Sequence, residues 1–136
     1  MAANGLFDST TAVLKKTLDL RMQNQQVVAS NIANAETPGY AAKRFEFEDQ
    51  LRAAVEANDS NMLRTHPLHL PRQGDSIEKV NGRIVEYPDT SGLGDRNSVD
   101  MDHEMAVMAK NQLYYEATTQ LLSKKMGILK YAIQGQ

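Results

Sequence analysis

Hydrophobic residues recur at helical spacing along the N-terminal part of the chain. Over residues 8–34 they step by three, four and seven along one stripe, which Arg21 and Gln25 interrupt. The stripe consists of Phe7, Leu14, Leu18, Val28, Ile32 and Ala35, and a second seam beside it consists of Val13, Leu20 and Val27. This spacing predicts an amphipathic helix roughly 40 Å long, with Asp8 or Ser9 as its N-cap.

The C-terminal part carries a longer and more regular pattern. Apolar positions step by four and three without a break, which is the a/d pattern of a heptad repeat. Its members are Met101, Met105, Met108, Gln112, Tyr115, Thr119, Leu122, Met126, Leu129 and Ile133. The pattern predicts a helix over residues 98–133, with Ser98 or Asp100 as N-cap. Methionine adapts to non-identical surroundings, so its frequency here favours a stripe that meets more than one kind of neighbour.

The middle of the chain, residues 40–97, lacks such a period and is interrupted by proline and glycine. The Asn81-Gly82 pair between residues 76–80 and 83–87 predicts a short β-hairpin. Residues 45–57 predict a short helix, and residues 88–97 read as a flexible loop.

Together these patterns predict a mainly α protein with three parts. Residues 1–39 hold the first helix and a turn, residues 40–97 form a poorly ordered middle segment, and residues 98–136 hold the heptad helix. The two long helices are expected to pair as a coiled coil. Because two helices bury one seam on each other, the second seam of each is expected to need another chain.

Composition excludes several classes of function. The 136 residues make one small domain, and a net charge of −2 provides no general basic field for nucleic acid. The absence of cysteine excludes disulfides, thiolate metal sites and cysteine nucleophiles. The first residues lack the pattern of a secretory signal, and no apolar run of about 20 residues is present.

The histidines do not predict a metal site. His66 and His69 are separated by Pro67 and followed by Pro71, so they cannot share a helix face and read as solvated loop residues. His103 lies among acidic residues at a helix start, which favours a local electrostatic contact. No nucleophile–base constellation or phosphate-binding loop is visible, so we expect neither a cofactor nor an enzymatic activity.

The most specific string of the chain is SNIANAETPGY at residues 30–40. Pro38 fixes its own φ and moves Thr37 out of the helical region, while Gly39 accepts backbone angles that other residues avoid. The string therefore predicts the end of a helix followed by a sharp turn. Asn31 and Asn34 either cap this helix end locally or form hydrogen bonds between chains, and both roles can hold at once.

This string resembles the signature of the bacterial flagellar rod and hook proteins, in which Asn-Ile-Ala-Asn precedes Thr-Pro-Gly-Tyr. The signature residues are Asn31, Ile32, Ala33, Asn34, Thr37, Pro38, Gly39 and Tyr40. Residues 97–133 resemble the end of the same family, so the likeness covers about half the chain. The short length and the FEFEDQL stretch at residues 45–51 most resemble the proximal rod members, with other rod proteins as the nearest alternative.

The resemblance implies a structural subunit of the basal-body rod, the drive shaft that crosses the periplasmic space and transmits torque. Residues 1–39 and 98–136 would form the core of the rod. Expected partners are further copies, other rod proteins, the rod adaptor FliE, and MS-ring or export-gate components at the rod base, with no nucleic acid or small-molecule substrate. The expected interface heptad comprises Leu14, Leu18, Val28, Ile32, Met101, Met105, Met108, Tyr115, Leu122, Met126, Leu129 and Ile133.

The resemblance also implies a route out of the cytoplasm. The subunit would leave through the flagellar type III apparatus without a cleaved signal peptide. Phe47 and Leu51, in FEDQL, match a short export-gate motif of early flagellar substrates. One turn of amphipathic helix explains the same spacing.

Two other classes of function stay open at this point. A soluble helical adaptor or chaperone-like protein would also present amphipathic helices to partner helices. A small hydrolase acting on the cell wall is the third class, and the lack of a plausible acid–nucleophile pair argues against it.

Overall fold

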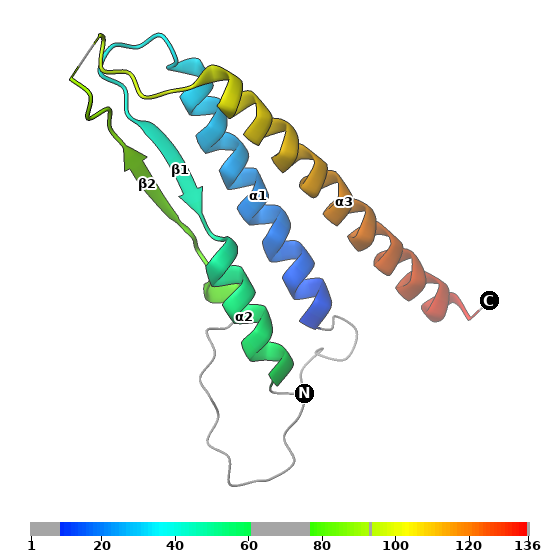
Figure 1. Cartoon of the computed structure of the whole chain (residues 1–136). Helices are drawn as coiled ribbons and strands as arrows, with labels where there is room; N and C mark the ends of the chain where they lie inside the picture. The colour runs from blue at the N-terminus through cyan, green and yellow to red at the C-terminus, as the bar shows by residue number, and fades with distance from the viewer. Residues whose placement is uncertain (1–8, 61–76, 93, 136) are drawn as a thin grey trace, which may run out of the picture.

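The computed structural model describes residues 9–60, 77–92 and 94–135, and it is mainly α-helical, which confirms the predicted fold class (Figure 1). Its elements are α1 (Ser9–Ala33), β1 (Ala42–Glu46), α2 (Glu48–Ser60), the 3-10 helix η2 (Ile77–Lys79), β2 (Arg83–Tyr87) and α3 (Met101–Gln134). The prediction of solvated histidines at positions 66 and 69 lies outside the described residues. Within the described ranges, no helix has the length and apolarity needed to cross a membrane.

Both long helices form close to where the sequence predicts them. The side chain of Asp100 accepts a hydrogen bond from the backbone N–H of His103 at 3.2 Å and caps the start of α3. Gly135, with φ of 67°, ends the helix in the left-handed conformation. The helices run antiparallel, close together where α1 ends and α3 begins, and they diverge toward the C-terminus of α3 (Figure 1).

The predicted hairpin is wrong, although its second strand is present. β2 pairs antiparallel with β1, with Ala42 opposite Tyr87 and Glu46 opposite Arg83. Residues 77–79 form a 3-10 helix instead of a strand, because Ile77 and Val80 are buried in the core. In a strand these two side chains, three residues apart, would point to opposite faces and could not both reach that core.

The predicted helix at residues 45–57 begins later than expected. Phe45 lies in β1, and α2 starts at Glu48. Phe45 and Phe47 are two residues apart, and their ring centroids lie 5.4 Å from each other. Extended backbone places two such side chains on one face, which explains why the helix begins only after them.

A small hydrophobic core joins α1, α2 and η2. It consists of Leu20, Phe47, Ala54, Ile77 and Val80, with Val13, Phe45 and Leu51 packed against it. The two-stranded sheet lies along α1 (Figure 1). Among the described residues, α3 contributes no hydrophobic side chain to the buried set. Hydrophobic burial therefore holds the middle segment to α1, whereas the buried side chains of α3 are polar.

Candidate functional site

The turn after α1 is stabilised by the side chain of Asn34. Its Nδ2 donates to the carbonyl of Ser30 at 2.8 Å, and its Oδ1 accepts from the hydroxyl of Thr37 at 3.2 Å. This is the local capping role predicted from the sequence. Gly39, with φ of 73°, donates its N–H to the carbonyl of Asp95 at 2.7 Å. The turn is thereby tied to the segment that precedes α3.

Asn31 is fully buried and connects three elements. Its Oδ1 accepts from the N–H of Lys43 at 2.9 Å, and its Nδ2 donates to the carbonyl of the same residue at 2.7 Å. One amide thus pairs with both backbone groups of a residue in β1, as a neighbouring strand would. Nδ2 also donates to Oε2 of Glu104 at 3.0 Å, which links α1 to the start of α3.

Residues 95–98 complete this connection, and the sequence predicted only a loop and a cap for them. Nδ2 of Asn97 lies within 2.9 Å of the carbonyls of Asn34, Ala35 and Thr37. Ser98 is not the helix cap: its hydroxyl donates to the carbonyl of Tyr87 and accepts from the N–H of Ala42. Asp95 and Asn97 of the predicted flexible loop at residues 88–97 are thus hydrogen-bonded to the turn, and Ser98, directly after the loop, is hydrogen-bonded to both strands.

The seam between α1 and α3 is polar. Nδ2 of Asn24 donates to Oδ1 of Asn111 at 3.0 Å, seven residues along each helix from the contact of Asn31 with Glu104. The same register places Thr17 opposite Thr118 one step further on. We call these six residues the polar ladder: Thr17, Asn24 and Asn31 of α1, and Glu104, Asn111 and Thr118 of α3.

Arg21 and Gln25, which interrupt the apolar stripe of α1, lie at this seam. Oε1 of Gln25 accepts from Nδ2 of Asn111 at 2.9 Å. The guanidinium of Arg21 lies 5.0 Å from the ring centroid of Phe47 and 4.6 Å from that of Tyr114, and it forms an ion pair with Glu48 at 3.0 Å. The polar residues of the ladder recur every seven positions along each helix, and this was the sequence signal for the seam. The sequence interpretation followed the apolar period instead.

The seam corrects the expectation that the predicted heptad packs α3 on α1. Met101, Met105, Tyr115 and Ile133 are exposed, while Met108, Leu122, Met126 and Leu129 are half-buried. On α1, Val28 is buried, and Leu14, Leu18 and Ile32 are half-buried. The buried positions of α3 are Glu104, Asn111 and Thr118 instead. Contact of the heptad with other chains stays a prediction.

Most of the exposed large hydrophobic side chains of the described residues lie on α3. We call this set the α3 apolar surface: Met101, Met105, Leu113, Tyr114, Tyr115, Leu121, Ile128, Tyr131 and Ile133. Ile128 and Ile133 are each 69% exposed. A helix that is apolar on several faces is normally covered by neighbours on several sides. This surface is therefore suited to packing against further helices.

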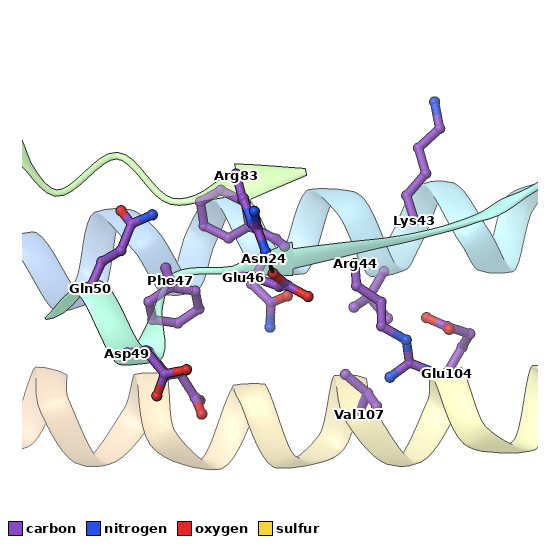
Figure 2. A pocket seen from close by; sticks show the side chains of 13 residues that line it. Asn24, Lys43, Arg44, Glu46, Phe47, Asp49, Gln50, Arg83, Glu104 and Val107 are labelled. Atoms are coloured by element: carbon purple, nitrogen blue, oxygen red, sulfur yellow. Dashed lines mark hydrogen bonds and ion pairs between the residues drawn. The ribbon is translucent and has the colours of Figure 1, made fainter. Parts of the chain in front are cut away.

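A groove of about 550 Å³ opens between α1, β1, α2 and α3 (Figure 2). Its charged groups include Glu46, which receives two hydrogen bonds from Arg83 and one from Tyr87. These hydrogen bonds lower the pKa of Glu46 below its ordinary value of 4.5, and the bond from Arg83 has the larger effect. Across the described residues, no three His, Asp or Glu side chains are grouped as a metal ion would require.

The two residues of the predicted export motif lie at the hydrophobic core. Phe47 is 3% exposed, and Leu51 packs against the core cluster. Phe47 is therefore hidden from the surface of the folded chain, whereas Leu51 is half-buried.

Comparison with known proteins gives consistent matches along the chain. The family model for flagella basal body rod proteins matches residues 14–40, a range that includes the signature turn. The flagellar basal body rod protein FlgB of Salmonella typhimurium (strain LT2) is 32% identical over 133 residues, covering 94% of this chain and 95% of the relative. FlgB of Bacillus subtilis (strain 168) is 34% identical over 130 residues, with 96% and 97% covered, and FlgB of Aeromonas hydrophila is 30% identical, with 96% of each covered.

Proposed function

This chain belongs to the FlgB family of flagellar basal body rod proteins, and we propose that it polymerises through its terminal helices as a subunit of the proximal rod. It is a structural protein of the flagellar basal body, which assembles with other rod components. The proposed role is mechanical: the subunits form a shaft in the periplasmic space, and torque passes through their contacts.

The α3 apolar surface carries this proposal. Its side chains lie on a long helix whose polar seam faces α1 and whose C-terminal part diverges from that helix (Figure 1). At about 25 cal/mol per Å², a few hundred Å² buried per contact stabilises an assembly by several kcal/mol before ordering costs. Heterologous contacts that repeat without closing generate a helical tube, which is the form that a shaft requires.

The position of the subunit at the base of the rod is proposed from the family resemblance. There it would contact the rod adaptor FliE and components of the MS ring or the export gate. Further copies and other rod proteins would cover the remaining exposed apolar residues.

The test of assembly uses two substitutions that introduce the same charge on the exposed surface of α3. Ile128 belongs to the α3 apolar surface, and Gln120 is also exposed. In the source bacterium with its own copy deleted, Ile128→Asp should abolish swarming and leave basal bodies without a complete rod, whereas Gln120→Asp should restore motility. Equal motility from both variants would show that this apolar surface is not an assembly contact.

Export through the flagellar type III apparatus is a second part of the proposal. Because Phe47 is buried in the core, an export receptor could bind both residues of the motif only in a chain that is not yet folded. Unfolded passage would also prevent premature polymerisation.

Secretion of variants tests this export step. Phe47→Ala combined with Leu51→Ala should strongly reduce the secreted protein. Leu20→Ala removes a fully buried core side chain outside the motif, so it lowers folding stability without touching the proposed signal. Its secretion should stay normal. Undiminished secretion of the double variant would remove the motif from the account.

A further inference from the structure

The seam between α1 and α3 is polar although α3 offers many apolar side chains. Asn111 is 2% exposed, whereas Met105, less than two turns earlier on the same helix, is 58% exposed. Burying methionine in place of asparagine would bury more apolar area. The arrangement thus needs a reason other than maximal stability.

We infer that the polar ladder determines which face of α3 meets α1, and in which register. Nδ2 of Asn24 donates to Oδ1 of Asn111 at 3.0 Å, and Nδ2 of Asn111 donates to the carbonyl of Arg21 at 2.9 Å. These donors and acceptors match in one alignment. A shift would leave a buried amide without partners, and that is costly, whereas apolar contacts tolerate small shifts.

The ladder also defines the rotation of α3 about its own axis. Met105 directly follows Glu104, so it lies about 100° around the helix from the ladder, since 3.6 residues make one turn. Rotating α3 by about a quarter turn would bring Met105 against α1 and turn Asn111 outward. The hydrogen bonds of Asn111 oppose this rotation.

The two ends of the ladder contribute differently. The contact between Asn31 and Glu104 lies beside the signature turn, and the hydrogen bonds of Asn31 with Lys43 in β1 hold Asn31 in place there. At the other end, the hydroxyls of Thr17 and Thr118 donate to carbonyls of their own helices, at 2.8 and 2.7 Å. These small, internally satisfied side chains allow close approach without a cross-helix bond. Asn24 and Asn111 are therefore the pair that determines the facing away from the turn.

One consequence rests on the proposed function. By holding its polar residues against α1, α3 keeps Met101, Met105 and Tyr115 exposed for a neighbouring subunit. An apolar seam would compete for the same side chains within one chain. The ladder thereby separates the intrachain face of α3 from its assembly face.

Disulfide formation in the lone chain tests the inference, because the natural sequence contains no cysteine. Thr17→Cys is combined either with Thr118→Cys, which faces it in the ladder register, or with Thr119→Cys, which faces it only after rotation. We define the facing ratio as the rate of disulfide formation of the 17/118 pair divided by that of the 17/119 pair. With the ladder intact, the 17/118 pair should close at least about tenfold faster.

The decisive comparison replaces Asn24 and Asn111 by leucine in both cysteine backgrounds. The facing ratio should fall by about tenfold, the effect expected from losing the hydrogen bonds of this pair. Gln23→Leu with Gln112→Leu, each one position away and exposed, should leave the ratio unchanged. An unchanged facing ratio after removal of the asparagines would overturn the inference.

Loss of helical circular dichroism in that variant would also overturn it, because side chains that determine only which face of α3 meets α1 are not required for folding. Neither outcome depends on assembly, so the proposed function is tested separately.

Discussion

At the scale of single residues, Asn31 has the largest set of roles in this chain. Its amide satisfies both backbone groups of Lys43 and donates to Glu104. By occupying the free edge of β1 it also protects that strand from pairing with another chain. The sequence indicated a capping or interchain role for this residue, and neither included the strand, because β1 itself was not predicted.

Replacing Asn31 by alanine should destabilise the chain by roughly 2–4 kcal/mol. The substitution leaves the backbone groups of Lys43 and the buried carboxylate of Glu104 without these partners. Asn34→Ala removes partly exposed bonds in the adjacent turn and should cost about 1 kcal/mol. Urea unfolding of the two variants measures both values. Equal losses would show that Asn31 is only a local cap.

The Glu46 carboxylate should titrate below 4.5. The hydrogen bonds from Arg83 and then Tyr87 favour its charged form and lower its pKa. A lowered folded pKa means that the contribution to stability is present above pH 4.5 and is lost as the pH falls through the folded pKa. Carbon-13 NMR titration should show the midpoint rising toward 4.5 in Arg83→Gln, and less in Tyr87→Phe. A normal midpoint in the unmodified chain would contradict these contacts.

At the scale of elements, the helices could be predicted and the sheet could not. α1 and α3 have long apolar periods and clear ends, and Asp100, which caps α3, was one of the two cap candidates in the local sequence. β1, with the sequence AKRFE, has no strand signal of its own and pairs with a strand some forty residues away. Asn81-Gly82 correctly indicated a left-handed backbone position, since Gly82 has φ of 63°. The residues before that pair do not form a strand, because Ile77 and Val80 are buried in the core.

Gly82 is constrained both by its backbone and by its neighbours. A Cβ there would lie 2.5 Å from Cζ of Phe45 and 3.0 Å from Cβ of Phe47. Gly82→Ala should cost roughly 2–4 kcal/mol, because left-handed strain adds to overpacking. Gly92 has φ of 68°, and a Cβ added there would meet no atom within 4 Å, so Gly92→Ala should cost about 1–2 kcal/mol from strain alone. Thermal unfolding of the pair measures the difference, and equal losses would mean that the Phe45 contact adds nothing.

The polar ladder illustrates a general limit of periodicity. The heptad of α3 predicted the existence and length of the helix correctly, yet its apolar members are largely outside the intrachain seam. An apolar stripe shows that a face will be covered, and it does not show by which chain. Asn24, Asn31, Glu104 and Asn111 became informative only once both helices were placed side by side.

At the scale of the whole molecule, two kinds of contact divide the chain. The hydrophobic core binds the middle segment to α1, whereas hydrogen bonds bind α3 to α1 near the signature turn. The signature turn could be recognised from residues 30–40 alone. Its contacts with Asp95, Asn97 and Ser98 could not, because they join parts of the chain far apart in sequence.

The central claim is that the C-terminal part of α3 becomes fully covered only among other subunits. Amide hydrogen exchange, measured on the lone chain and on rods assembled with the other rod proteins, tests it most directly. In the lone chain, amides of residues 121–134 should exchange much faster than those of residues 104–118, which contain the α3 members of the polar ladder. In the assembled rod both segments should exchange slowly. Equal and strong protection of the two segments in the lone chain, or no slowing of residues 121–134 on assembly, would contradict the account.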